Sequence, residues 1–371
     1  MRSLLIPAFL LLAACSDSSG PAAPAAVEAP DKVGHVFIIV LENMNYADTF
    51  GAGAASGAPY LTSDLPARGA LLTQYHATGH VSLDNYISMV SGQSPNPATS
   101  GDCLFFLDWL GTTAPDADGQ VTGIGCVYPP AVRTVANQLQ EAGYSWKGYM
   151  EDMGNDLARD GSATCAHPPL NAQDPTQSAS ASDQYATRHN PFVYFHSIID
   201  DQANCDARVR PLTDLPADLA LAAATPHYVF ITPNLCNDGH DTGCANGDPG
   251  GQASIDTFLR EWVPQILESA AFQQDGLLIV TFDEALPSDG AACCNEPTGP
   301  NTPFPGIVGP GGGRIGAVLI SPLIRPGTVS DVPYNHYAML RSIEDMFGLP
   351  YLGYAGQMGL VTFGPDVFTA R

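Results

Sequence analysis

The arrangement of hydrophobic and polar positions along the chain predicts strands that alternate with helices. Short apolar runs of strand character occupy residues 36–41, 71–75, 145–149, 228–232, 277–282 and 315–321. Apolar positions with the spacing of a helical face occupy residues 83–91, 134–142, 255–269 and 337–346. This alternation is typical of proteins in which helices cover both faces of a parallel sheet. We therefore predict an α/β fold with a largely parallel central sheet.

Two long segments, residues 94–130 and 151–190, show neither pattern and are rich in Gly, Pro, Asp and Ser. Irregular segments of this length within a compact domain are usually functional. We expect both to be insertions in the domain. The pattern leaves open whether the second insertion forms a lid over a site.

The first 15 residues have the pattern of a lipoprotein signal peptide. Arg2 supplies a positive charge, residues 4–12 form an apolar run too short to span a bilayer, and a small-residue cleavage site ends at Cys15. An ordinary cleaved signal peptide is the alternative interpretation. Residues 16–31 form a tether of Ser, Ala and Pro. We expect a domain over residues 32–371 that is exported to the periplasm or cell surface and anchored to the membrane by a lipid on Cys15.

The remaining cysteines are even in number, which in an exported chain implies disulfides. They are Cys103, Cys126, Cys165, Cys205, Cys236, Cys244, Cys293 and Cys294. Pairing of nearest neighbours is the simplest arrangement and would join the adjacent Cys293 and Cys294. A zinc site is the alternative, but the chain lacks the CxxC pairs that such sites use.

The composition adds a strongly acidic charge balance, with 38 acidic residues against 14 basic ones and a formal net charge of −24. A surface of this charge repels nucleic acids and anionic lipid headgroups. We therefore expect no nucleic-acid partner, and the charge does not indicate a substrate or an oligomeric state.

Polar side chains follow two of the predicted strands at the point where each strand ends. Glu42 and Asn43 follow the first strand, and Asp283 and Glu284 follow the strand at residues 277–282. The carboxyl ends of parallel strands are where open α/β sheets bind ligands. These oxygen donors suit Mg²⁺, Ca²⁺ or Mn²⁺ better than Zn²⁺. We predict a divalent metal site at this edge, and acids that cap the next segment or face solvent are the alternative.

Ser82 is the candidate nucleophile. It precedes the helical run that stops at Gly92, so N-capping alone would explain a serine there. A helix N-terminus also attracts anions, and a hydroxyl bound to a divalent cation becomes a usable nucleophile. His80, two residues earlier, could orient this hydroxyl or bind a phosphate oxygen.

Two further histidines are candidates for the same site. His240 lies between Asp238 and Asp241 and could donate a proton to a leaving-group oxygen, although a histidine bonded within a polar loop is the alternative. His336 begins the last helical run and is the remaining candidate.

Several motifs resemble those of a known family. ENMNYADTFG resembles the ENxSYDxxFG opening of the bacterial and fungal phosphoesterases, which include metal-dependent acid phosphatases and phospholipases C. GHVSLDNYISMVSG resembles their HPSxPNYxAxxSG nucleophile segment. Four further segments resemble family segments in the same order: YATRHNPFVYF, ITPNLCNDGHD, TFDE and YNHYAMLRSIEDMFGL. Six ordered motifs over residues 35–349 are far more specific than one.

The resemblance implies a three-layer fold like that of alkaline phosphatase, and it assigns roles to the candidate residues. One divalent metal would be bound by Glu42, Asn43, Asp283, Glu284 and the oxygen of Ser82. The phosphoryl oxygens would be contacted by His80, His240 and His336. Ser82 would attack phosphorus. Val81 and Asp84 replace two family prolines, and ALPSDGAACCN replaces a glycine-rich run, so the pocket wall and the substrate range are expected to differ.

We therefore predict a phosphate-ester hydrolase that acts on phosphomonoesters through a phosphoserine intermediate on Ser82. A phospholipase C that cleaves lipid headgroup phosphodiesters is the alternative within the family. A metal-binding surface lipoprotein without turnover is the alternative outside it.

Overall fold

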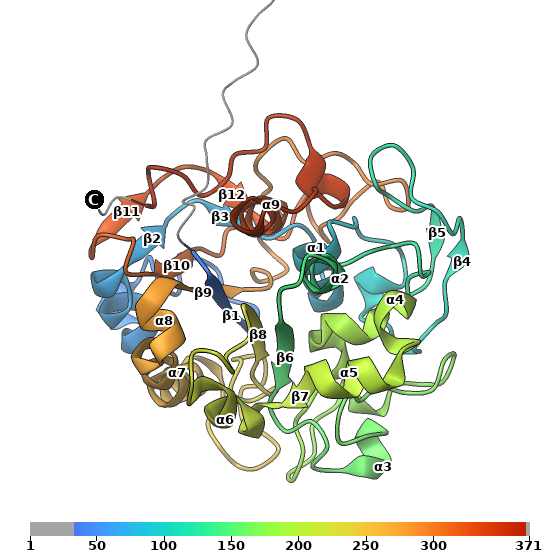
Figure 1. Ribbon diagram of the computed structural model, residues 1–371, viewed down its shortest axis with the longest axis horizontal. Helices are drawn as coiled ribbons and strands as arrows, with labels where there is room; N and C mark the ends of the chain where they lie inside the picture. Colours follow the sequence, from blue (N-terminus) through green and yellow to red (C-terminus); the bar gives the residue numbers. More distant parts are fainter. Residues whose placement is uncertain (1–32, 369–371) are drawn as a thin grey trace, which may run out of the picture.

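The computed structural model describes residues 33–368 (Figure 1). The expected signal peptide, the lipid-bearing Cys15 and the tether at residues 16–31 lie outside the described residues. Of the helices between residues 33 and 368, none combines the length and the apolar character needed to cross a lipid bilayer.

Eight strands form the central sheet of the described chain, in the order β11-β2-β10-β9-β1-β8-β6-β7. Their bounds are β1 (His35–Leu41), β2 (Ala70–Leu72), β6 (Trp146–Met150), β7 (Val209–Pro211), β8 (Tyr228–Thr232), β9 (Gly276–Phe282), β10 (Ala317–Ile320) and β11 (Thr328–Ser330). β10 runs antiparallel to β9 and β2, whereas the other neighbouring pairs are parallel. The predicted largely parallel sheet is therefore confirmed.

Two small sheets lie outside the central one. β3 (Tyr75–His76) pairs with β12 (Tyr334–Asn335), and β4 (Leu110–Gly111) pairs with β5 (Gly123–Ile124) inside the first insertion. The single strand predicted over residues 71–75 was wrong in one respect, because its two ends pair with different partners and belong to β2 and β3.

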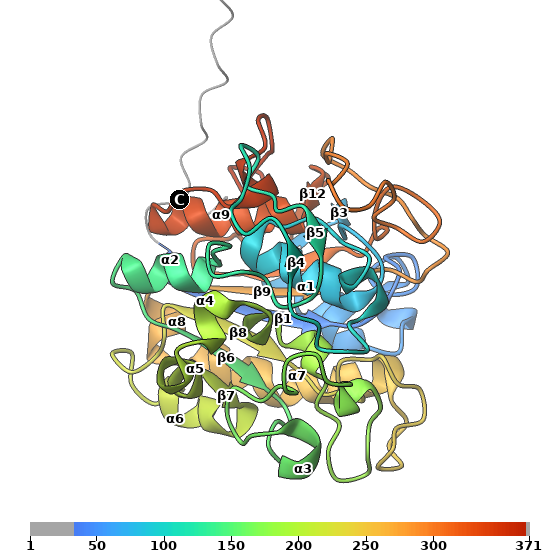
Figure 2. The ribbon, with the colours of Figure 1, turned by 90° about the vertical axis from the view of Figure 1, so that its right-hand side faces the viewer.

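Helices cover both faces of the sheet, which gives three layers (Figures 1 and 2). One face carries α1 (Ser82–Ser91), α2 (Val135–Glu141) and α9 (His336–Phe347), which contact one another. The opposite face carries α6 (Leu215–Leu219), α7 (Gly251–Glu268) and α8 (Ala270–Asp275). The shorter helices α3 (Leu157–Asp160), α4 (His196–Ile199) and α5 (Gln202–Arg208) lie in the chain between β6 and β7.

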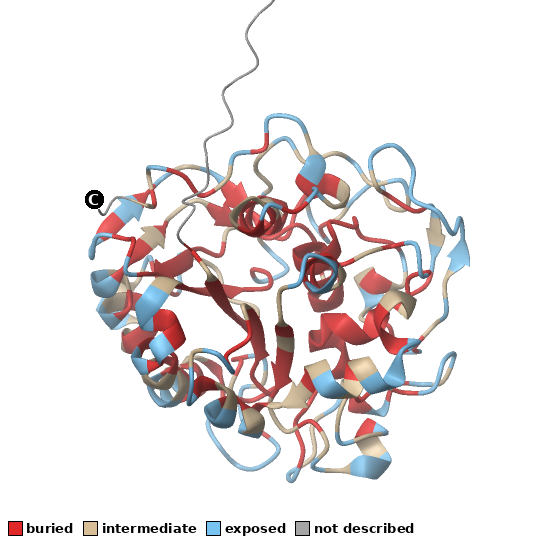
Figure 3. Ribbon diagram, in the orientation of Figure 1, coloured by how far each residue is buried: buried red, intermediate tan, exposed pale blue. Residues whose placement is uncertain are grey.

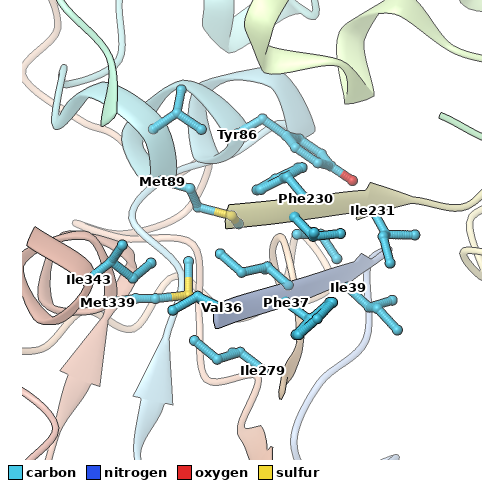
Figure 4. Packing of buried hydrophobic residues seen from close by; sticks show 14 of the residues in the cluster. Val36, Phe37, Ile39, Tyr86, Met89, Phe230, Ile231, Ile279, Met339 and Ile343 are labelled. Atoms are coloured by element: carbon cyan, nitrogen blue, oxygen red, sulfur yellow. The ribbon is translucent and has the colours of Figure 1, made fainter. Parts of the chain in front are cut away.

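The hydrophobic core explains why the central strands read as continuous apolar runs. Every residue of β1, β8 and β9 is buried (Figure 3). Alternate side chains face opposite layers: the ring of Phe37 lies 6.2 Å from that of Phe272 in α8, and the ring of Phe230 lies 6.2 Å from that of Tyr86 in α1. Met89 of α1 and Met339 of α9 pack over the same strands (Figure 4). A sheet buried on both faces needs apolar residues at every position.

Four disulfides pair the eight cysteines as nearest neighbours. They are Cys103–Cys126, Cys165–Cys205, Cys236–Cys244 and Cys293–Cys294. The first closes a loop within the insertion at residues 94–130. The second ties the insertion at residues 151–190 to α5. The predicted disulfides and their nearest-neighbour pairing are therefore confirmed.

We expect the Cys165–Cys205 disulfide to contribute strongly to stability, because it closes a loop of 40 residues. In the loop-entropy description, replacing both cysteines by alanine lowers the free energy of unfolding by about 4 kcal/mol. Replacing Cys293 and Cys294, which are one residue apart, removes almost no loop constraint and is expected to cost less than about 1 kcal/mol. Guanidinium unfolding of the two double variants measures the difference, and equal losses would contradict the loop argument.

Candidate functional site

The predicted site residues lie where adjacent parallel strands end at the same edge of the sheet. Leu41 at the end of β1 pairs with Phe282 at the end of β9, so the residues that follow each strand are neighbours. The amide N–H of Asn43 donates to Asp283 Oδ1 at 3.2 Å, and its side-chain Nδ2 donates to Glu284 Oε1 at 2.6 Å. The register of two strands 240 residues apart in sequence therefore brings all four predicted ligands together.

Ser82 is the first residue of α1 and lies against these acids. Its Oγ is buried and donates to Glu42 Oε2 at 2.8 Å. It does not cap the helix, because the capping position is Val81 and carries no side-chain capping bond. Asp102 serves that end of α1 instead, since its Oδ1 accepts from the Leu83 N–H at 2.9 Å. The interpretation of Ser82 as a simple N-cap is thus wrong, and its hydroxyl belongs to the acidic group.

Tyr86 occupies the next turn of α1 and holds the other oxygen of Glu42. Its hydroxyl donates to Glu42 Oε1 at 2.8 Å. Its ring stacks on His189, with centroids 5.3 Å apart and planes 14° apart. Residues four apart on a helix share a face, so one helix supplies a donor to each carboxylate oxygen of Glu42. The sequence did not single out Tyr86, although it lies inside the motif that resembles the family's nucleophile segment.

His80 contacts Glu284 on the other side of the group. Its Nδ1 is hydrogen-bonded to Glu284 Oε2, and its Nε2 lies 3.1 Å from the carbonyl oxygen of Asp289. Both partners can only accept if Glu284 is ionised, so the two bonds require either a doubly protonated imidazole or a protonated Glu284. Burial raises the pKa of Glu284 well above its usual range, which favours the protonated carboxyl in the absence of a cation.

His189 and Asp238 complete a cluster that the sequence interpretation missed. His189 Nε2 lies 3.3 Å from Glu42 Oε1, and His189 Nδ1 lies 3.2 Å from Asp238 Oδ2. Ligand atoms of Glu42, His189 and Asp238 all lie within 4.8 Å of one another, and all three residues are buried. His189 lies in the segment YATRHNPFVYF, which supported the family resemblance. Its place in that motif was the feature of the sequence that could have marked His189 as a site residue. Asp238 was considered only as a neighbour of His240.

His240 lies at the rim of this cluster. Its side chain is 37% exposed, its Nδ1 lies 2.8 Å from Asp241 Oδ1, and its ring centroid is 6.2 Å from that of His189. Gly239 has a φ of +101°, a conformation that favours glycine, and separates the buried Asp238 from the more accessible His240. His240 is therefore a predicted site residue that solvent and a ligand can reach.

His336, by contrast, is fully buried and bonded on both ring nitrogens. It is the first residue of α9, its Nε2 lies 2.6 Å from the carbonyl oxygen of Asp283, and its Nδ1 lies 3.2 Å from the hydroxyl of Tyr75. Burial lowers the pKa of His336 to about 4. A neutral imidazole that donates from Nε2 and accepts at Nδ1 satisfies both bonds.

The electrostatics of the group fit a divalent cation. Burial raises the pKa values of Glu42 and Asp238 well above their usual range and that of Asp283 to about 7. Within this group, three buried oxygens have no hydrogen-bond partner among the described residues: Asn43 Oδ1, Asp238 Oδ2 and Asp283 Oδ2. Unpaired buried oxygens and crowded carboxylates are unfavourable unless they are neutralised. The oxygens match a hard cation, and His189 adds a nitrogen donor that the sequence interpretation did not include.

We expect the hydrogen bond from Tyr86 to Glu42 to stabilise the fold independently of the packing of the Tyr86 ring on His189. Tyr86→Phe keeps the stack on His189 but removes a donor from a buried carboxylate, and should lower the free energy of unfolding by about 1–3 kcal/mol. Tyr228 is a matched control, because its buried hydroxyl has no hydrogen-bond partner in the part of the chain that the structure describes. Tyr228→Phe should be neutral or stabilising. Chemical denaturation measures both, and equal effects would show that the hydroxyl of Tyr86 contributes nothing.

Comparison with known proteins identifies relatives among phosphatases. A phosphate-repressible acid phosphatase of Penicillium chrysogenum is 30% identical over 291 residues, which cover 78% of the chain and 55% of that protein. An acid phosphatase of Aspergillus fumigatus is 27% identical over 317 residues, covering 85% of the chain and 55% of that protein. A phosphatidylinositol-3-phosphatase of Mycobacterium tuberculosis is 26% identical over 321 residues, which cover 86% of the chain and 79% of that protein. The chain thus spans about half the length of these two fungal relatives.

The chain also resembles solved structures. A candidate sulfatase of Bacteroides thetaiotaomicron matches with a TM-score of 0.50 and 11% identity over 92% of the chain and 75% of that protein. A protein of the alkaline phosphatase superfamily from Vibrio parahaemolyticus matches with a TM-score of 0.46 and 14% identity over 86% of the chain and 67% of that protein. The model of the Phosphoesterase family matches residues 55–350, most of the chain. The chain therefore belongs to the Phosphoesterase family.

Proposed function

We propose that this protein is a metal-dependent phosphoesterase that hydrolyses phosphomonoesters through a phosphoserine intermediate on Ser82. The observation that carries the proposal is the 2.8 Å hydrogen bond from the buried Ser82 Oγ to Glu42 Oε2 at the start of α1. A serine hydroxyl aimed at a carboxylate can lose its proton as it attacks. The acid phosphatase names of the fungal relatives agree with this reaction.

The proposed reaction has two displacements. Ser82 Oγ attacks phosphorus and its proton passes to Glu42, while the bond between phosphorus and the ester oxygen breaks and the leaving oxygen takes a proton from water. Water then attacks the phosphoserine, the bond between phosphorus and Ser82 Oγ breaks, Glu42 returns its proton to Ser82 Oγ, and phosphate is released. The positive end of α1 stabilises negative charge at Ser82 in both steps. A divalent cation held by Glu42, Asn43, Asp283 and Glu284 would lower the pKa of the hydroxyl and offset phosphoryl charge.

The histidines take different roles in this proposal. His240 is the accessible one, so we assign to it the contact with phosphoryl or leaving-group oxygens. His80 orients Glu284, and its Nε2 could reach substrate only by releasing the carbonyl of Asp289. His336 holds the carbonyl of Asp283 and therefore acts as a positioning residue. A direct contact of His336 with phosphoryl oxygens, which the family resemblance implied, would require one of its two bonds to break.

A second candidate substrate is a lipid phosphodiester, and one observation favours it. The carbonyl oxygen of Pro305 accepts from the His80 N–H at 3.0 Å, so the loop at residues 285–313 borders the site. Phe304, Ile307 and Val308 in this loop are each more than half exposed. An exposed apolar loop beside a phosphoester site could contact acyl chains. The disulfides support export, and a lipid anchor on Cys15 remains a proposal.

Ser82→Ala tests the nucleophile. We expect kcat for p-nitrophenyl phosphate to fall by more than about 10³-fold, because the attacking atom is removed. Ser91→Ala is the control: Ser91 is a buried serine on the same helix whose Oγ donates to the Ile87 carbonyl at 2.7 Å, and its removal should leave kcat unchanged. Acid quenching of wild type with labelled substrate should trap phosphate on Ser82. Turnover that survives in Ser82→Ala would overturn the proposal, and cation binding without any wild-type turnover would favour a binding lipoprotein.

The raised carboxyl pKa values predict how stability depends on pH and metal. In metal-free protein Asp283 has a folded pKa of about 7 against about 4 when unfolded, so the folded state holds a proton that the unfolded state has lost. Stability therefore falls as pH rises from about 4 to about 7. A cation binds the deprotonated ligands, so the rise in Tm on adding Mg²⁺ or Mn²⁺ should grow over the same interval.

Two variants separate the site from other buried acids. Asp283→Asn should remove most of the cation-dependent rise in Tm at pH 7.5. Glu296→Gln is the matched control, because burial raises the pKa of Glu296 to about 8 and its partner is Asn335, outside the acidic group. That variant should change the pH dependence of the metal-free protein and keep the full response to the cation. A cation response that persists unchanged in Asp283→Asn would place the metal elsewhere.

A further inference from the structure

Arg188 is a buried cation beside the site, and the proposed reaction gives this residue no role. Its side chain is only 4% exposed. Its contacts are all long: Nε lies 3.7 Å from Asp102 Oδ2, and the terminal nitrogens lie 3.5 Å from His240 Nε2 and 3.4 Å from the carbonyl oxygen of Gln177. Charge-assisted hydrogen bonds of arginine are normally 2.7–2.9 Å long. The guanidinium is therefore enclosed by the protein without a close partner.

Arg159 shows how this protein holds an arginine that has a structural role. Its side chain is 9% exposed, and its NH1 lies 2.8 Å from both Asp160 and Asp183. Its NH2 donates to the carbonyl of Tyr185 at 2.6 Å. Within residues 33–368, Nε has no hydrogen-bond partner in either arginine, so the two differ in the contacts of their terminal nitrogens. Those of Arg159 are saturated at short distances, whereas those of Arg188 are not.

Two separate paths of contacts connect Arg188 to the nucleophile. Asp102 lies between the guanidinium and the N–H of Leu83, the residue after Ser82. On the other side, His240 lies between the guanidinium and His189, which contacts Glu42. Arg188 thus lies near both the start of α1, through Asp102, and the accessible His240, which are the two elements that would flank the phosphoryl group of a substrate attacked by Ser82.

We propose that the guanidinium of Arg188 binds non-bridging phosphoryl oxygens of the substrate and selects dianionic phosphomonoesters over phosphodiesters. This inference rests on the proposed function. A planar fork of N–H donors matches two phosphoryl oxygens at once, which a lysine cannot reproduce. A buried guanidinium whose donors lack close partners is free to make these bonds when substrate arrives.

The preference for monoesters follows from charge. A phosphomonoester above pH of about 6 carries nearly two negative charges, whereas a diester carries one. The surrounding acids, Glu42, Asp238, Asp283 and Glu284, repel the dianion more strongly than the monoanion. The positive charge of Arg188 offsets more of this repulsion for the monoester than for the diester. Removing that charge should therefore lower kcat/KM more for monoesters than for diesters.

The first test compares the hydrolysis of a phosphomonoester with that of a phosphodiester. Arg188→Met and Arg188→Lys are assayed on p-nitrophenyl phosphate and bis-p-nitrophenyl phosphate at pH 7.5 with saturating Mg²⁺ or Mn²⁺. We expect Arg188→Met to lower kcat/KM for the monoester by about 100-fold and for the diester by less than about threefold. Arg188→Lys should keep the positive charge and lose the planar fork of donors, so its kcat/KM for the monoester should fall between those of wild type and Arg188→Met. Arg159→Lys, the control, should lower Tm and leave the ratio of the two kcat/KM values unchanged.

Binding of inorganic phosphate separates this inference from the proposed function. Titration calorimetry of Ser82→Ala against Ser82→Ala/Arg188→Met should show at least a tenfold weaker Kd in the double variant, with no dependence on turnover. Equal Kd values, or equal losses of kcat/KM for both esters, would overturn the role of Arg188 while leaving hydrolysis by Ser82 intact. Absence of wild-type hydrolysis of either ester would defeat the proposed function instead, and the phosphate titration would still decide whether Arg188 binds the anion.

Discussion

The site depends on the in-register pairing of two buried parallel strands that each end in a carboxylate. Because Leu41 lies opposite Phe282, the chain cannot form its core without bringing Glu42 close to Asp283. Both acids are fully buried, and like charges in an apolar environment are costly when ionised. Neighbouring polar groups donate hydrogen bonds to these carboxylates or hold the backbone at the strand ends, while some of the acidic oxygens keep no hydrogen-bond partner among the described residues.

The helical layer over the sheet determines how these acids are approached. α1 and α9 pack against each other and on the same strands, and both begin at the edge where the acids lie. α1 thereby presents Ser82 and Tyr86 to the two oxygens of Glu42, while α9 presents His336 to the carbonyl of Asp283. The positions of these polar atoms follow from apolar contacts such as those of Met89 and Met339 (Figure 4). Close packing of the core leaves little freedom to shift them.

The irregular segments at residues 94–130 and 151–190 contribute further residues to the site. The segment at residues 151–190 delivers Arg188 and His189, and the segment at residues 94–130 delivers Asp102. These segments have little regular secondary structure to fix their backbone, and disulfides such as Cys165–Cys205 supply part of that constraint. The sheet edge and helices thus form the acidic half of the site, whereas the segments at residues 94–130 and 151–190 bring positive and titratable groups of the kind that the proposed phosphoryl binding needs.

The sequence by itself determined the elements and residues that local pattern controls. Apolar runs that end in acids predicted the central strands and the grouping of Glu42 with Asp283, because parallel strands share their carboxyl edge. Motif order indicated the family, and the cysteine order favoured nearest-neighbour pairs. Only the tertiary structure decided the antiparallel β10, the hydrogen bond of Ser82 to Glu42, and the buried position of His336. His189 and Arg188 gained their places in the same way. Each of these depends on partners tens to hundreds of residues away, and a local pattern contains no information about which distant group will lie opposite a given side chain.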